Sequence, residues 1–330
     1  MKGLDLERLR DYLGSDRELT GRMFAGGRSN LTYAITDGER RWVLRRPPLG
    51  HVLPTAHDMV REHRVLEALS KAGFPAPRPM LLCTDTEVIG APFYLMEHVD
   101  GTIYRDENDL QALGGPAMHA LVLSLVDTLV QLHGLEPAAI GLADFGRPEG
   151  FNARQVHRWK KQLDASRSRE VPGIEELHAR LAVDIPAGGP GAVVHGDYRL
   201  DNVLIGPDMR INAVLDWEMS TLGDPLSDVA LMLVYAGLPL EVKNGRGVVP
   251  LAVPGHPSIL EISSRYAERS GRDVSDLHWY VGFAAFKLAV ILEGVHYRYV
   301  QGQTVGAGFD TIGSLVGPLV MRGHEALEGN

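Results

Sequence analysis

The stretch Val193-Val194-His195-Gly196-Asp197-Tyr198-Arg199-Leu200-Asp201-Asn202-Val203-Leu204-Ile205 runs from one short apolar segment through a polar loop into another. Its second apolar segment, Val203–Ile205, is followed by Gly206-Pro207-Asp208-Met209-Arg210 and then by a further β-branched run, Ile211 to Leu215. Two such runs joined by a turn rich in glycine, proline and aspartate are typical of a β-hairpin. The sequence therefore predicts an antiparallel strand pair directly after the polar loop.

Polar residues stand at both open ends of this predicted hairpin. Asn202 directly precedes the first strand and Asp216 directly follows the second, and Asp197 lies on the loop that leads to them. The start of one antiparallel strand lies beside the end of its partner, so we expect Asn202 and Asp216 at the same edge. Amide and carboxylate oxygens suit Mg²⁺ better than zinc or copper. We predict these two residues as magnesium ligands and Asp197 as the group that orients a nucleophile.

The spacing of the loop supports this interpretation. His195, Asp197 and Asn202 form H-x-D-x-x-x-x-N, and Asp216 follows where kinases place a metal-binding aspartate. The alternative is a polar hairpin whose Asp and Asn residues only cap turns. That alternative requires the spacing, the flanking apolar strands and the second aspartate to coincide by accident, so we favour a catalytic loop.

These residues resemble the aminoglycoside phosphotransferase and choline kinase superfamily, whose members write the loop as H-G-D-x-x-x-x-N and the metal motif as D-W-E or a relative. Here the two motifs fall on His195–Asn202 and Asp216–Glu218. Within the superfamily, the chain is most similar to the kinase-like domain fused to some acyl-CoA dehydrogenases. The segments that carry this closer similarity are Val43–Pro48, Phe93–Glu97 and Leu222–Pro225, and the resemblance spans about Phe24 to Arg298.

The resemblance implies an α+β, protein-kinase-like fold with two lobes. We expect residues 1–97 to form a nucleotide-binding lobe with a small antiparallel sheet and one main helix. Residues 98–330 are expected to form a larger, mostly helical lobe for catalysis and substrate binding. A length of 330 residues is sufficient for two lobes with a substantial core.

A glycine turn between two predicted strands, Met23 to Tyr33, is the first candidate for nucleotide binding. Such a turn can direct backbone N–H groups at phosphates, and we predict phosphate contacts at Gly27, Arg28, Ser29 and Asn30. By itself, a Gly-Gly turn is more often an ordinary hairpin. Its spacing also departs from the G-x-G-x-x-G of protein kinases.

Arg45 ends the third predicted strand, at the position where kinases of this type usually carry a phosphate-binding lysine. Arginine keeps the charge and can bind phosphate with two hydrogen bonds, but it is larger and planar. The alternative is an exposed arginine on an edge strand.

Glu62 lies on a predicted helix over residues 58–71 and shares one face with Val65, Leu66 and Leu69. A carboxylate on a buried face requires a partner. The resemblance implies that this glutamate contacts the strand cation, so we predict a Glu62–Arg45 pair. The alternative is a glutamate at the edge of the apolar stripe.

Glu97 to Gly101 is predicted to connect the lobes. In the resembling enzymes the adenine ring binds backbone groups of this connection, which makes Glu97 and Val99 candidates through their main chains. We also expect Asp228 to brace the catalytic loop by accepting backbone hydrogen bonds, and His133 to pack near it.

A basic run on the predicted helix Gln155–Arg167 contains Arg158, Lys160, Lys161 and Arg167. Runs of this kind are usually solvated faces. The alternative is a rim that receives an anion from a phosphorylated or CoA-bearing substrate.

Composition sets limits on partners and location. A net charge of −9 argues against nucleic acid as a partner, and the single cysteine, Cys83, excludes an intramolecular disulfide. The first residues lack the apolar segment of a signal peptide. The stretch Val281–Val295 is interrupted by Lys287 and Glu293, and we expect it to be too short to span a bilayer. We therefore expect a cytoplasmic protein without a membrane partner, whose oligomeric state the sequence does not indicate.

Together, the loop and the resemblance imply transfer of the γ-phosphoryl group of ATP, or of GTP, to a hydroxyl group with Mg²⁺ as cofactor. The expected acceptor is a small molecule such as a hydroxyacyl-CoA or another hydroxy compound. One alternative is a nucleotide-binding pseudokinase that acts as a regulatory or interaction module, which the arginine at position 45 supports and the intact loop residues oppose. A metal-dependent hydrolase is less favoured, because no second histidine-rich ligand cluster accompanies the loop.

Overall fold

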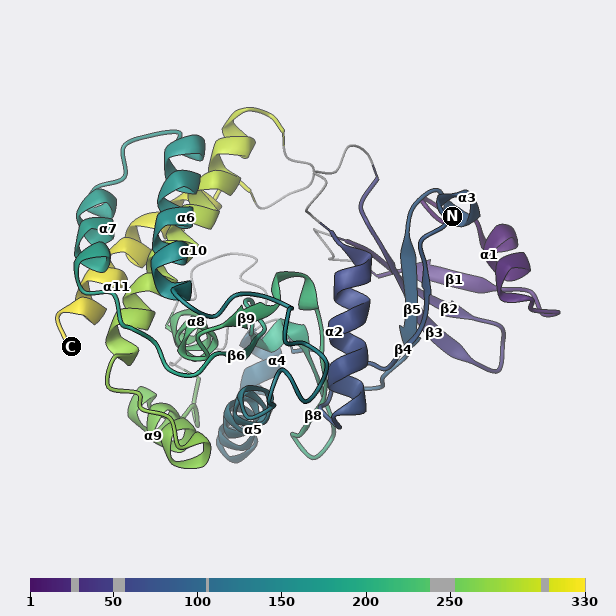
Figure 1. Ribbon diagram of the computed structural model, residues 1–330, viewed down its shortest axis with the longest axis horizontal. Coiled ribbons are helices and arrows are strands. Elements are labelled where there is room, and N and C mark those ends of the chain that lie inside the picture. The colour runs from purple at the N-terminus through teal and green to yellow at the C-terminus, as the bar shows by residue number, and fades with distance from the viewer. Residues whose placement is uncertain (25–29, 50–56, 105–106, 238–252, 304–308, 330) are drawn as a thin grey trace.

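The computed structural model describes residues 1–24, 30–49, 57–104, 107–237, 253–303 and 309–329. An antiparallel sheet with its helices forms the N-terminal part of the chain, and a larger helical part follows (Figure 1). This arrangement confirms the expected two-lobed, protein-kinase-like α+β fold.

The N-terminal sheet has five strands in the order β1-β2-β3-β5-β4, all antiparallel. They are β1 (Thr20–Met23), β2 (Leu31–Thr36), β3 (Arg41–Arg46), β4 (Pro79–Cys83) and β5 (Phe93–Glu97). Because side chains alternate along a strand, Trp42 and Leu44 join one apolar cluster, with Leu9 of helix α1 (Leu6–Leu13). Val43 joins the other cluster. Arg45, two residues further along, therefore points to the same face as Val43.

Helix α2 (Met59–Lys71) packs on that second face, between the sheet and the helical lobe (Figure 1). It begins after Asp58, whose side chain accepts a hydrogen bond from the Arg61 amide at 3.0 Å. Val65 and Leu69 are fully buried on its inner stripe, and Glu62 lies on the same stripe at 2% exposure. The predicted helix is confirmed, and it brings a carboxylate to the strand that carries Arg45. A short helix, α3 (Thr86–Ile89), connects β4 and β5.

The C-terminal lobe contains the remaining helices. They are α4 (Glu107–Gln111), α5 (Gly115–His133), α6 (Phe151–Ser166), α7 (Ile174–Val183), α8 (Leu226–Ala236), α9 (Ile259–Ser270), α10 (Leu277–Val300) and α11 (Val316–Leu327), with 3₁₀ turns η1 (Leu200–Asn202), η2 (Trp217–Met219) and η3 (Ile312–Leu315). Two short antiparallel pairs complete the lobe. Strand β6 (Ala192–Val194) pairs with β9 (Thr221–Gly223), and β7 (Val203–Ile205) pairs with β8 (Ile211–Val214). The β7–β8 pair is the hairpin that the sequence predicts.

Helices α5 and α10 are long and apolar enough to cross a membrane when only length and composition are considered. The expectation that the apolar stretch is too short was wrong, because α10 extends beyond it at both ends, from Leu277 to Val300. Phe286 and Val290 of α10 are fully buried, and the helix packs against α6, α8 and α11. Burial in the helical lobe accounts for its apolar character.

Replacing Phe286 by alanine is expected to lower the free energy of unfolding by about 3–5 kcal/mol, because a fully buried ring leaves a cavity in a packed core. Urea denaturation followed by circular dichroism measures the change. Leu260→Ala on α9 is the control, since Leu260 is 75% exposed and its loss should change stability by less than about 0.5 kcal/mol. Equal effects of the two substitutions would contradict the assignment of α10 to the core.

Candidate active site

Asp228 holds the loop from His195 to Asn202 in place. Its carboxylate, in the first turn of α8, accepts hydrogen bonds from the backbone amides of His195 at 2.6 Å and Gly196 at 2.8 Å. Gly196 has φ +83, and a Cβ atom there would lie 2.7 Å from the Met219 carbonyl oxygen. Only glycine fits this close approach without strain. The bracing role predicted for Asp228 is therefore present in the structure.

A buried histidine supports Asp228 from behind. His133, the last residue of α5, places Nε2 at 3.4 Å from the Asp228 carboxylate and Nδ1 at 2.8 Å from the Tyr266 hydroxyl. Burial by itself would raise the pKa of Asp228, but the interaction with His133 and the hydrogen bond from the His195 amide outweigh it and lower that pKa. The predicted position of His133 near the loop is confirmed.

His195 organises the loop through both ring nitrogens. Its Nδ1 accepts a hydrogen bond from the Asp197 amide at 3.2 Å, so Nε2 carries the proton and donates to the Leu215 carbonyl at 2.8 Å. The imidazole therefore ties the loop to the end of the β7–β8 hairpin. It is fully buried, lies against the Trp217 ring with the two planes tilted by 57°, and acts as a structural group.

Asp197 presents a carboxylate that is held on both oxygens. Oδ2 accepts from Asn202 Nδ2 at 3.1 Å, and Oδ1 accepts from the Tyr235 hydroxyl at 3.1 Å, while the side chain stays 32% exposed. Tyr235 was not among the residues predicted from the sequence. A signal was available, because Tyr235 lies seven residues after Asp228 on α8 and therefore shares its helical face.

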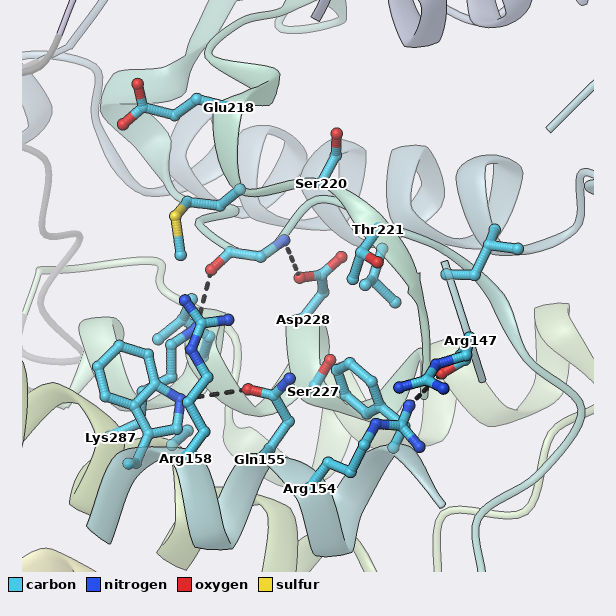
Figure 2. A pocket seen from close by; sticks show the side chains of 18 of the residues that line it. Arg147, Arg154, Gln155, Arg158, Glu218, Ser220, Thr221, Ser227, Asp228 and Lys287 are labelled. Carbon is cyan, nitrogen blue, oxygen red and sulfur yellow. Dashed lines mark hydrogen bonds between the residues drawn. The ribbon is translucent and has the colours of Figure 1, made fainter. Parts of the chain in front are cut away.

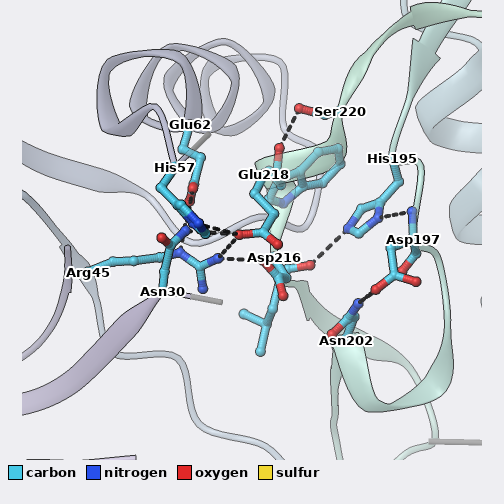
Figure 3. Close-up of polar contacts among 12 residues, drawn as sticks. Asn30, Arg45, His57, Glu62, His195, Asp197, Asn202, Asp216, Glu218 and Ser220 are labelled. Atoms are coloured by element: carbon cyan, nitrogen blue, oxygen red, sulfur yellow. Dashed lines mark hydrogen bonds and ion pairs between the residues drawn. The ribbon is translucent and has the colours of Figure 1, made fainter. Parts of the chain in front are cut away.

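Asn202 and Asp216 lie at the same edge of the hairpin, as predicted, where the Leu215 amide donates to the Asn202 carbonyl at 2.7 Å (Figure 3). The Asn202 Nδ2 group donates to the main chain and side chain of Asp197, which leaves Oδ1 as its possible ligand atom. Asp216 has φ 65 and ψ 65, a left-handed conformation that costs a non-glycine residue about 1–3 kcal/mol. Such strain is typical of functional positions.

Arg45 reaches these loop residues from the other lobe (Figure 3). Its Nε lies 2.8 Å from Glu62 Oε2, and its Nη2 contacts Asp216 Oδ1 directly and Glu218 Oε2 at 3.4 Å. The predicted ion pair with Glu62 is present. β3 is a central strand and Arg45 is buried, so the alternative of an exposed edge arginine is wrong. Burial opposes the charge, but Glu62 and Asp216 outweigh it and raise the pKa of Arg45.

Asn30 joins the same network. Its amide donates to Glu62 at 2.8 Å and to Glu218 at 3.0 Å, so it connects carboxylates from α2 and η2. Tyr94, which was also not predicted from the sequence, donates to Glu62 at 3.0 Å. Burial raises the pKa of Glu62, which Arg45 and Tyr94 oppose. The other residues predicted in the glycine turn, Gly27, Arg28 and Ser29, lie outside the described residues.

The predicted adenine contacts stand at the end of β5. The Glu97 amide donates to the Arg78 carbonyl at 2.9 Å and is therefore already engaged. The predicted adenine contact at Glu97 then concerns its carbonyl group. Val99 follows the strand in the connection to the helical lobe. Both positions stay predictions.

A cavity of about 690 Å³ adjoins the loop and lies among α2, η2, α6, α8 and α10 (Figure 2). Gly196 and Met219 contribute to its wall beside Arg158 and Lys287. The basic residues predicted on the helix Gln155–Arg167 therefore have different surroundings. Arg158 lines the cavity, whereas Lys160 and Arg167 pair with Glu175 at 3.4 and 2.7 Å. Arg158 is exposed, as the prediction of a solvated face expects, and it also lines the cavity.

Asp228→Asn is expected to lower the free energy of unfolding by about 1.5–3 kcal/mol for each charge-assisted bond that it weakens, because an amide NH₂ then faces a backbone N–H. Urea denaturation at neutral pH measures the loss, with Asp208→Asn in the exposed hairpin turn as control.

The loss of stability caused by Asp228→Asn should depend on pH. The pKa of Asp228 is lowered in the folded protein, so its stabilisation is complete above the unfolded carboxyl value of about 3.9 and disappears as the pH falls through the folded value. The difference in the free energy of unfolding between the wild type and Asp228→Asn should therefore become smaller below about pH 4. A difference that stays constant with pH would contradict the role of the charge.

Solved structures similar to this chain agree with the fold. A putative aminoglycoside phosphotransferase from Ralstonia eutropha is 30% identical, with a TM-score of 0.85 over 99% of both chains. A thermostable mutant of aminoglycoside phosphotransferase APH(4)-Ia, in a ternary complex with AMP-PNP and hygromycin B, shares the fold with a TM-score of 0.62 and 15% identity over 98% of both chains.

Acyl-CoA dehydrogenase family member 11 of Gallus gallus is 36% identical over 319 residues, which are 93% of this chain and 40% of that protein. The chain therefore spans less than half the length of this curated relative. The resemblance to the kinase-like domain of such proteins is confirmed. The family model described as the phosphotransferase enzyme family matches residues 20–246, more than half of the chain, and the chain belongs to this family.

Proposed function

We propose that the protein transfers the γ-phosphoryl group of ATP to a hydroxyl group of a small molecule. One observation carries the proposal: Asp197, Asn202 and Asp216 meet at one loop edge, and a buried cation from the other lobe contacts Asp216 directly. The AMP-PNP in the solved neighbour described above supports a nucleotide ligand, with GTP as the alternative donor.

Asp197 orients the acceptor hydroxyl and takes its proton. Hydrogen bonds from Asn202 and Tyr235 fix the direction of its carboxylate, and its partial exposure leaves it accessible to an acceptor. A base of this kind contributes about 10²–10⁴-fold to the rate. Most of the catalysis then comes from positioning and charge neutralisation.

The donor set fits Mg²⁺. Among the described residues no group of three or more His, Cys, Asp or Glu residues is placed to hold a metal ion. Asn202 and Asp216 instead offer two hard oxygen ligands, which is typical of magnesium sites that substrate phosphates complete. Bound there, Mg²⁺ supplies charge neutralisation to the phosphates.

Arg45 binds the nucleotide phosphates, and Glu62 positions it. The pair takes the place of the lysine and glutamate of related kinases, and the guanidinium is a good phosphate ligand because it offers several donors in one plane. The alternative of a pseudokinase depended on the arginine at this position. Its pairing with a buried glutamate weakens that argument.

The proposed acceptor is a hydroxyacyl-CoA or another hydroxy compound, and the proposed location is the cytoplasm. The similarity to acyl-CoA dehydrogenase family member 11 supports an acyl-CoA acceptor. The cavity beside the loop has a volume of about 690 Å³, within the range of small-molecule sites.

The test is phosphoryl transfer from Mg·ATP to a panel of hydroxyacyl-CoAs, amino alcohols, sugars and aminoglycosides, read by phosphorus NMR. We expect a new phosphate ester with the wild type and at least a 10²-fold lower rate with Asp197→Asn, because the substitution removes the base. Binding of Mg·ATP without ester formation from any acceptor would favour the pseudokinase.

Glu62→Gln is expected to lower kcat/KM for ATP by about 10–100-fold, because it replaces a charge-assisted contact of Arg45 by a neutral one. Steady-state kinetics with varied ATP measures the effect. Glu67→Gln on the same helix is the control, since Glu67 is exposed and pairs with Lys71 at 2.7 Å. An unchanged kcat/KM in Glu62→Gln would contradict the positioning role.

A further inference from the structure

Four basic side chains gather on one side of the cavity beside the catalytic loop (Figure 2). We call this group the basic wall, and its members are Arg147, Arg154, Arg158 and Lys287. Arg154 and Arg158 lie four residues apart on α6, so they share one helical face. Lys287 comes from α10, which packs against α6. Tertiary structure thus brings these charges together from separate segments.

The charges of the basic wall are not neutralised by carboxylates in the described part of the chain. Arg154 donates to the backbone carbonyls of Arg147 and Glu149, and Lys287 donates to the Gly196 carbonyl at 3.0 Å. Neither the arginines of the wall nor Lys287 has an ion pair among the described residues. Burial lowers the pKa of Lys287, although the charges of Asp197 and Asp228 oppose this, and the positive charge of Arg158 makes a smaller contribution in the same direction as burial.

The acidic residues that also line the cavity are engaged elsewhere. Asp58 caps α2, and Asp228 binds the backbone of the catalytic loop. Glu62 and Glu218 contact Arg45 and Asn30. The three arginines of the basic wall therefore line the cavity without an ion pair to any described residue, and their positive charge attracts an anion.

We propose that the basic wall binds a phosphate-type anionic group of the acceptor molecule while the acceptor hydroxyl reaches Asp197. Gly196, which lines the cavity and receives the Lys287 hydrogen bond, directly precedes Asp197 in the chain. Guanidinium groups recognise phosphate through paired hydrogen bonds. This inference rests on the proposed function and narrows its acceptors to hydroxyl compounds that carry a phosphate or a similar anion.

The anion at the basic wall has three possible sources: the acceptor, free phosphate and the nucleotide. Calorimetric titration of inorganic pyrophosphate into the full chain, with the nucleotide site saturated by Mg·ADP and excess Mg²⁺, removes the nucleotide as a source. The wild type is expected to bind. Arg158→Gln and Arg154→Gln are each expected to weaken binding by about 10–100-fold, the effect of losing one charge-assisted contact.

Lys161→Gln is the matched control, because Lys161 lies on the same helix but does not line the cavity. Its dissociation constant should equal that of the wild type. Arg158→Gln remains informative if Arg154→Gln unfolds, because the Arg158 guanidinium lies over the Trp159 ring at 5.7 Å and forms no backbone bond in the described structure. Absence of pyrophosphate binding by the wild type, or a wild-type dissociation constant for Arg158→Gln, would overturn the inference.

A second experiment measures transfer to a hydroxyl acceptor and to its phosphate monoester. It tests whether the basic wall binds an anion that belongs to the acceptor or only free phosphate. Arg158→Gln should raise KM for the phosphorylated compound by about 10–100-fold and leave kcat unchanged, with no effect on its phosphate-free partner. Equal KM changes for both compounds would overturn the anionic acceptor while leaving the kinase intact. Arg158-dependent pyrophosphate binding without transfer to any acceptor would support the anion site and count against the proposed function.

Discussion

The buried carboxylate of Asp228 is the constraint on which the active site depends. It accepts the backbone amides of His195 and Gly196, and it is itself supported by His133. An uncompensated charge at full burial costs several kcal/mol, so these partners are necessary to the fold as well as to the loop. The loop conformation is therefore set by the packed interior of the helical lobe.

The packed interior of the helical lobe also positions Asp197, the proposed base. Helix α8 carries Asp228 near its start and Tyr235 near its end, so one rigid element holds both the loop backbone and the Asp197 carboxylate. Lys287 of α10 donates a further hydrogen bond to the Gly196 carbonyl at 3.0 Å. Because supporting groups on helices hold their geometry more tightly than groups on loops, this arrangement suits a reaction that relies on positioning.

Arg45 links the two lobes through charge. It pairs with Glu62 of its own lobe and with Asp216 and Glu218 of the other, and Asn30 joins Glu62 to Glu218. Removal of one partner would leave a buried charge without compensation. A ligand that takes Arg45 away from Asp216 must therefore supply negative charge in its place, as nucleotide phosphates do.

The sequence by itself determined the β7–β8 hairpin, helix α2 and the position of Glu62 on the buried face of that helix, because these follow from turn residues and from periodicities of two and three to four within short segments. The pairing of Glu62 with Arg45 was implied by the resemblance to the kinase superfamily. It did not determine that Tyr235 reaches Asp197 or that Tyr94 reaches Glu62. Those contacts join residues far apart in the chain, and no local pattern encodes their distance. The cavity and its basic wall likewise depend on how α6 packs against α10. Local periodicity fixes which face of an element is polar, but only tertiary packing decides which polar groups meet.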